Sequence, residues 1–110
     1  MTKDSLIELI EDTLNIPVFE GSQSIIYPAA TLEIIGHPAT LIGDGKAVVR
    51  ESEAFINLWF TEQSDRDADQ ALLLAALDTQ DGISVPECNS SYDTTAKKFR
   101  SVISFNFIPR

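Results

Sequence analysis

A tight-turn signal, Gly43-Asp44-Gly45-Lys46, lies between two long β-rich runs and constrains the fold more than any other feature of the chain. Asp-Gly favours a two-residue hairpin turn, because both central residues of that turn need a positive φ. If Asp44 and Gly45 form the turn, the expected cross-strand partners are Ile42 with Ala47, Ile34 with Phe55, and Ala30 with Trp59. Each arm would then exceed ten residues, about twice the usual strand length.

The outer part of this hairpin, from Pro38 to Glu53, carries polar and charged side chains on both faces. Such a ribbon cannot pack wholly on the core of a small domain, so we expect it to project into solvent or onto a neighbour. Proline removes a donor from the ladder. We therefore also expect a bulge, a bend or an exposed edge at Gly36-His37-Pro38.

Other segments predict further strands. The run Ala54–Phe60 is apolar on both parities apart from Asn57, as in a strand covered on both sides by helices or by another subunit. Residues 17–20 predict a short edge strand, and Ile83–Pro86 predict another, followed by a polar loop from Glu87 to Thr95. The clearest half-buried strand is the last one, in which the following residues share one parity: Phe99, Ile103, Phe105 and Phe107.

Two segments have helical spacing. Residues 4–14 form an amphipathic pattern that Asp4 or Ser5 can cap and that Asn15 and Pro17 end. Its apolar face consists of Leu6, Ile7, Leu9, Ile10, Thr13 and Leu14. The second helix is expected from Asp65 to about Thr79. It has Ala68, Ala71, Leu72 and Ala75 on one side and Leu73, Leu74 and Leu77 on the other, so we expect it to be buried on more than one side.

These elements predict an α+β fold: a mainly antiparallel sheet of four to five strands, a long protruding hairpin, and two helices packed on the sheet. A chain of 110 residues is one domain's worth, so residues 1–110 are expected to form a single domain. The longest apolar run, Ala71–Leu77, is too short to cross a membrane, and the N-terminal residues do not resemble an export signal. The lone Cys88 is in keeping with a reducing compartment.

The charge balance bears on possible partners. The net charge is −9, and only Lys97, Lys98 and Arg100 form a group of basic residues. Neutralising phosphates requires clustered Lys and Arg, so we expect no specific nucleic-acid binding, and these three residues predict only the solvated face of the last strand. Gly43-Asp44-Gly45-Lys46 lacks the spacing of a phosphate loop and has no helix after it.

The acidic stretch Ser64-Asp65-Arg66-Asp67-Ala68-Asp69-Gln70 suggests a calcium loop at first sight. Counted from Asp65, a calcium-binding loop needs a glycine at its sixth position and a glutamate at its twelfth, and Gln70 and Ala76 stand there instead. A helix start explains the stretch better, with Ser64 as the N-cap and Asp67 three positions on. We therefore predict no metal site.

His37 and Cys88 are the remaining candidates for chemistry. A Cys–His pair can be catalytic when the fold brings the two side chains together, but no nucleophile-turn signature surrounds Cys88. We predict that the protein is not an enzyme and needs no cofactor.

Surplus apolar surface and a long ribbon together predict association. A helix and a sheet that both need more cover than the chain provides point to an oligomer, of closed symmetry by default. The residues that we expect at the subunit interface are Arg50, Glu51, Glu53, Leu73, Leu74 and Leu77.

The order of these phrases resembles one known family. An amphipathic helix is followed by IPVFEG, YPAATLEIIG, a Gly-Asp-Gly hairpin, AFINLWFTEQSDRDADQALLLAAL and a final FRSVISFNFIPR. This series is similar to the tail-completion or tail-terminator (minor tail protein U-like) proteins of long-tailed bacteriophages and prophages. The likeness covers nearly the whole chain, and it lies in order and patterning, not in an invariant motif.

The resemblance implies a structural protein of the virion tail, present in the bacterial host cytoplasm during assembly. Such proteins form a ring, commonly a hexamer, at the end of the tail tube, stop its polymerisation and support joining to the head. The implied partners are further copies of the chain, the tail-tube protein and the head–tail connector. The alternatives are a small α+β interaction or adaptor domain, such as a toxin-immunity partner, or a small enzyme or ligand-binding module with Cys88, His37 or the Asp65-Asp67-Asp69 group in a pocket.

Overall fold

The computed structural model describes residues 2–20, 28–36, 40–42, 46–49 and 52–107. Its elements, in chain order, are α1 (Lys3–Leu14), β1 (Val18–Glu20), β2 (Ala29–Gly36), β3 (Thr40–Ile42), β4 (Lys46–Val49), β5 (Ser52–Phe60), α2 (Gln63–Asp78), β6 (Glu87–Asp93) and β7 (Lys98–Phe107).

Five of the strands form one open sheet in the order β1-β2-β5-β7-β6, and β3 and β4 form a separate two-stranded ladder. Only the β1–β2 pair is parallel; the β2–β5, β5–β7 and β6–β7 pairs are antiparallel. The predicted α+β class with a mainly antiparallel sheet and two helices is confirmed. The predicted edge strand is also present, because β1 borders the sheet.

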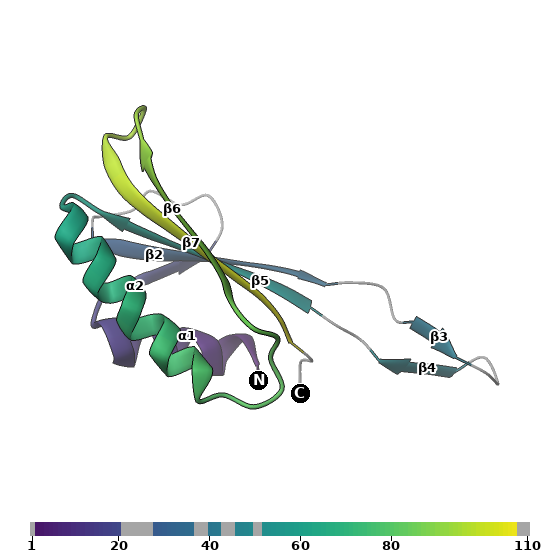
Figure 1. Cartoon of the computed structure of the whole chain (residues 1–110). Coiled ribbons are helices and arrows are strands. Elements are labelled where there is room, and N and C mark those ends of the chain that lie inside the picture. Colours follow the sequence, from purple (N-terminus) through teal and green to yellow (C-terminus); the bar gives the residue numbers. More distant parts are fainter. Residues whose placement is uncertain (1, 21–27, 37–39, 43–45, 50–51, 108–110) are drawn as a thin grey trace.

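Both helices pack against the same face of this sheet (Figure 1). The core between helices and sheet is made of apolar side chains that are nearly or fully inaccessible to solvent: Leu6, Ile10, Leu14, Ile16, Ala30, Leu32, Ala54, Ile56, Leu58, Phe60, Leu73, Leu77, Ile103, Phe105 and Phe107. The other face carries neither helix, so of the two kinds of cover expected for β5 the helices of this chain provide one side only, and cover of the other side by another subunit stays a prediction. We call this second surface the helix-free face.

The first helix begins at Lys3, one residue before the expected start. Its N-cap is Thr2, which accepts a hydrogen bond from the backbone N–H of Ser5, and the Ser5 hydroxyl in turn accepts one from the Thr2 backbone N–H. Neither Asp4 nor Ser5 is the cap; Ser5 instead completes a capping box. At the other end Asn15 has a φ of 54°, the left-handed conformation that stops a helix.

The register of the hairpin differs from the prediction by one residue. Ile42 pairs with Lys46, Ile34 with Ala54 and Ala30 with Leu58. Three residues, 43–45, separate the last pair, where the prediction assumed two. A slip of one residue exchanges the faces of a strand. Ala54 and Leu58 therefore lie in the core, and Phe55 and Trp59 lie on the helix-free face.

The ladder formed by β3 and β4, which we call the distal ribbon, extends beyond the ends of β2 and β5 and away from the helices (Figure 1). Among the described elements, β3 and β4 contact only each other. The radius of gyration is 15.2 Å, against about 13 Å for a compact domain of this size. The prediction of a protruding hairpin is confirmed.

The structure of the segment before the last strand differs from the prediction. The predicted strand at Ile83–Pro86 is wrong, since only Ile83 makes an isolated bridge, to Phe107. The predicted loop from Glu87 is instead β6, paired with β7 along its whole length. Its polar sequence hid it, because β6 is an edge strand in which five of seven residues are exposed.

Candidate functional site

The acidic stretch at residues 64–70 lies inside α2 and is not its cap. The helix begins at Gln63, its N-cap is Glu62, and no side chain caps it. Ser64 therefore does not act as the predicted N-cap. The backbone N–H of Arg66 donates to the Glu62 carbonyl at 3.2 Å, which places Ser64 within the first turn.

Arg66 anchors this turn to the sheet. Its side chain is 7% exposed, and its Nη1 donates to the backbone carbonyl of Ser91 on β6 at 3.1 Å. Its guanidinium also binds Asp67 Oδ1 at 2.9 and 3.0 Å and lies over the Phe99 ring. Sequence reasoning missed this residue. The signal was its spacing, because Arg66 precedes the buried Leu73 and Leu77 by two and three helical turns on the same stripe.

A polar cluster follows one turn further along α2. The Gln70 side-chain oxygen accepts hydrogen bonds from Ser101 Oγ at 2.7 Å and from Ser90 Oγ at 2.8 Å. Ser101 is fully buried, and its hydroxyl lies 3.4 Å from Cys88 Sγ. Because the Gln70 oxygen binds hydroxyl groups on both β6 and β7, the cluster links α2 to these two strands.

The three aspartates do not converge. Asp67 binds Arg66, whereas Asp65 and Asp69 lie one turn apart. Partial burial raises the pKa of Asp69 above its usual range, and the negative charge of Asp65 raises that pKa further. Across the described ranges, no group of three or more His, Cys, Asp or Glu residues is placed to hold a metal ion.

The Cys88–His37 hypothesis is not tested, because His37 lies outside the described residues. Cys88 itself is a free thiol, half-buried on β6, and belongs to the core side of the sheet. Its observed partner is the hydroxyl of Ser101.

The residues predicted for a subunit interface fall into three groups. Arg50 and Glu51 lie outside the described residues. Glu53 is on β5, half-buried, on the helix-free face. Leu73 and Leu77 are 0% exposed and belong to this chain's own core, and Leu74 packs partly against it. The faces of α2 are thus the reverse of the expected ones, because its exposed apolar residues are Ala68, Ala71, Leu72 and Ala75, and Leu73 and Leu77 are buried in this chain's own core.

The helix-free face has an ordered aromatic and polar centre. The Arg100 guanidinium lies 5.0 Å from the centroid of Trp59, and its Nε donates to Asn57 Oδ1 at 3.0 Å. Trp59 Nε1 is 3.5 Å from Thr31 Oγ1. These residues come from the three neighbouring strands β2, β5 and β7. These contacts link side chains of the three strands across the helix-free face.

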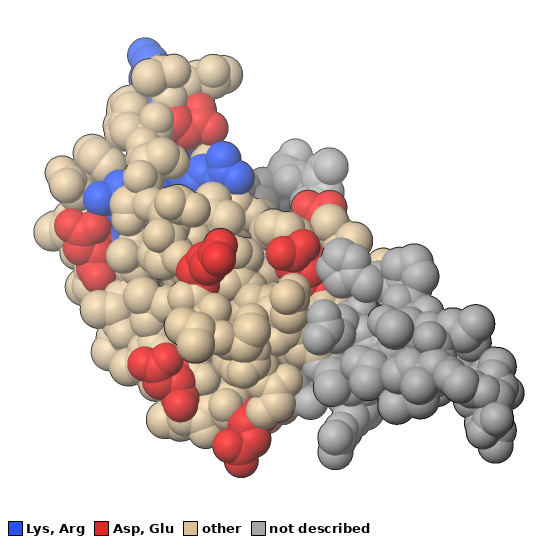
Figure 2. Space-filling model, turned by 45° about the vertical axis from the view of Figure 1, so that its right-hand side comes forward, with Lys and Arg blue, Asp and Glu red and all other residues tan. Residues whose placement is uncertain are grey.

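The two ends of this sheet carry opposite charges. Near the start of β6, Glu53, Ser84, Glu87, Ser104 and Asn106 line a pocket of about 80 Å³, with Val85 and Phe105 at its wall. We call it the acidic pocket. At the other end of β6 and β7 lie Lys97 and Lys98, which we call the basic turn. In the view of Figure 2, the blue Lys and Arg atoms lie in the upper part of the molecule and the lower part shows only acidic charges.

Comparison of the chain with protein-family models and with curated proteins gives no match. Within the part of the chain that the structure describes, neither helix has the length and apolar character needed to span a bilayer.

Proposed function

We propose that this protein is a structural subunit of a bacteriophage or prophage tail, a tail-terminator protein that forms a ring at the end of the tail tube. In this role it stops polymerisation of the tube and provides the surface for joining to the head. Its partners are further copies of itself, six in the commonest arrangement, the tail-tube protein and the head–tail connector. It acts in the host cytoplasm during assembly and remains in the virion.

The observation that carries this proposal is the distal ribbon. A two-stranded ladder alone is at best marginally stable in water, and β3 and β4 contact no other described element of the chain. A neighbouring subunit provides the surface on which such a ribbon gains stability. If each ribbon packs on the next subunit and is not exchanged with it reciprocally, the contact is head-to-tail, which is the kind of contact that closes into a ring.

The acidic charge agrees with a ring around a DNA passage. With a net charge of −9, the protein as a whole repels DNA, and its group of basic residues, Lys97, Lys98 and Arg100, is small. A passage lined by such subunits lets DNA slide without binding it.

The proposal is tested on tail tubes. Purified tail-tube protein is polymerised with and without this chain, and tube lengths and ends are measured by negative-stain electron microscopy. We expect a ring at one end of each tube and a shorter, narrower length distribution. Tubes that grow to the same length, with bare ends at saturating amounts of this chain, would contradict the proposal and favour the adaptor alternative.

A further inference from the structure

The basic turn is a rigid, exposed projection. Asp93 Oδ1 accepts hydrogen bonds from the backbone N–H groups of Thr95 and Ala96, both at 2.9 Å, and so closes the turn. Lys97 has a φ of 56° and is exposed at the tip. Directly below it, Tyr92 and Phe99 pack edge to face with 4.9 Å between ring centroids. The backbone that carries Lys97 is therefore held in a closed turn.

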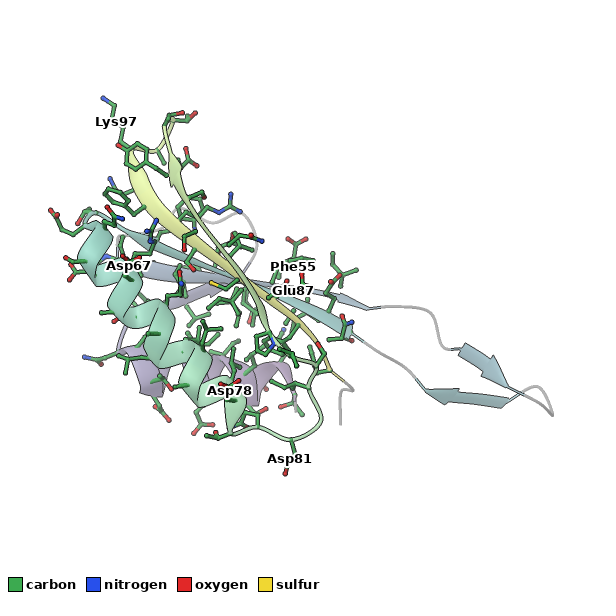
Figure 3. The ribbon with its side chains drawn as sticks, in the orientation of Figure 1. Phe55, Asp67, Asp78, Asp81, Glu87 and Lys97 are labelled. Atoms are coloured by element: carbon green, nitrogen blue, oxygen red, sulfur yellow. The ribbon has the colours of Figure 1, made fainter. Side chains whose placement is uncertain are left out.

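The acidic pocket lies at the opposite end of the same two strands. Glu87 pairs with Ser104 at the start of β6, and Asp93 pairs with Lys98 at its end. Asp93 is six positions after Glu87, which corresponds to about 20 Å of extended strand. Figure 3 shows Lys97 at the tip of the β6–β7 hairpin and Glu87 far from it, toward the other end of the hairpin. One subunit thus presents a cation at one end and a carboxylate pocket at the other.

The pocket fits a lysine side chain. Its volume of about 80 Å³ suits an ammonium group, and Ser84, Ser104 and Asn106 supply oxygen acceptors beside the Glu87 carboxylate. Val85, at the wall of the pocket, is 86% exposed and is the most exposed of the large apolar side chains among the described residues. A lysine needs both features, because its aliphatic stem packs on apolar surface while its charged end binds oxygen.

We propose that a second copy of this chain occupies the acidic pocket, with Lys97 of one subunit bound beside Glu87 of the next. In the ring of the proposed function, each pair of neighbouring subunits makes this contact once, head to tail; the same contact made twice about a two-fold axis would give a closed dimer instead. This inference rests on the self-association in the proposed function and names the surface that mediates it.

The expected effect is moderate for each contact and large for the assembly. An exposed ion pair contributes little by itself, but apposed like charges are costly. In a ring every subunit both gives and receives this contact, so one substitution changes all of them. We expect a single charge reversal to raise the concentration needed for half-assembly by about tenfold or more.

Charge exchange tests the contact. Lys97→Glu and Glu87→Lys are each expected to impair assembly, measured by analytical ultracentrifugation, whereas the double variant Lys97→Glu/Glu87→Lys is expected to recover it. In an equimolar mixture, one single variant carries two carboxylates and the other carries two lysines. If the two variants alternate around the ring, every contact pairs a lysine with a glutamate, so the mixture should also recover assembly. Glu11→Lys, an exposed site on α1, is the matched control for the change of charge.

The outcomes are distinguishable. If the single variants assemble like the wild type, or if the double variant assembles no better than they do, the proposed contact is wrong while ring formation stands. Lys97→Gln, which removes the charge without adding repulsion, should give an intermediate defect, and circular dichroism checks that each variant is folded. If the wild-type chain neither associates nor forms rings on tail tubes, the contact and the proposed function both fail.

Discussion

The helix-covered body and the distal ribbon are stabilised in different ways. In the body, β5 alternates strictly between buried and half-buried residues, and the buried ones meet α1 and α2 across a continuous core. The ribbon is made of one strand of three residues and one of four, joined only to each other. The body therefore has a continuous core of its own, and under the proposed function the ribbon is stabilised by a neighbouring subunit. The difference teaches that the distal ribbon, unlike the β6–β7 hairpin, is not needed for the core of the body.

The largest expected effect breaks the body. Leu77→Asp places a charge in a site that is 0% exposed, at a cost of about 4 kcal/mol or more, which is comparable with the whole stability of a small domain. We expect the purified variant to lack a cooperative thermal transition. Leu72→Asp is the matched control on the same helix, because Leu72 is 53% exposed; it should melt within a few degrees of the wild type. Similar melting of the two variants would contradict the observed faces of α2.

A smaller effect is expected at the anchor between α2 and the sheet. Arg66→Ala removes the bond to Ser91, the pair with Asp67 and the contact with Phe99. Hydrogen bonds made by a buried charged group contribute about 1.5–3 kcal/mol, so we expect a loss of about 2–3 kcal/mol in urea unfolding. A variant as stable as the wild type would show that the anchor is dispensable. Arg66→Lys should lose part of that stability, since an ammonium group cannot make the same planar set of contacts.

The smallest effect concerns pH. The pKa of Asp69 is raised, first by burial and then by Asp65, so its charged form is disfavoured in the folded state. Because the folded state binds the Asp69 proton more tightly than the unfolded state does, protonation of Asp69 favours folding. This contribution to the free energy of unfolding is lost as the pH rises through the folded-state pKa. Asp69→Asn should therefore stabilise the protein at pH 7, and its advantage in melting temperature should shrink as the pH is lowered toward the usual aspartate range. An advantage independent of pH would contradict this assignment.

The sequence predicted the larger elements well because their periodicity is strong. The amphipathic pattern of α1 and the alternation in β7 led to correct elements, and the chain order led to the correct fold class. Details that depend on tertiary contacts were wrong. The β2–β5 register differs by one residue from the predicted one, so the predicted cross-strand partners of β5 were wrong, and the polar edge strand β6 has no hydrophobic alternation to reveal it.

The candidate site was less accessible from the sequence. Arg66, Gln70 and Ser101 are polar residues at buried or partly buried positions, and their partners are distant in the chain. The acidic pocket and the basic turn are separated by most of β6, so only pairing with β7 shows that they lie at opposite ends of one hairpin. The leucines of α2 were assigned to the wrong side, because both sides of that helix are apolar.

The most direct measurement compares the size of the full chain with that of a chain whose ribbon is removed. Gly36 and Ser52 are paired at the end of the β2–β5 ladder, so an Asn-Gly turn in place of residues 37–51 joins them without disturbing the body. Light scattering coupled to size exclusion gives the mass of both chains, and thermal melting checks that both are folded. We predict a ring for the full chain and a folded monomer for the shortened one. A shortened chain that still forms the ring, or one that no longer folds, would contradict the division between a self-sufficient body and a ribbon used for assembly.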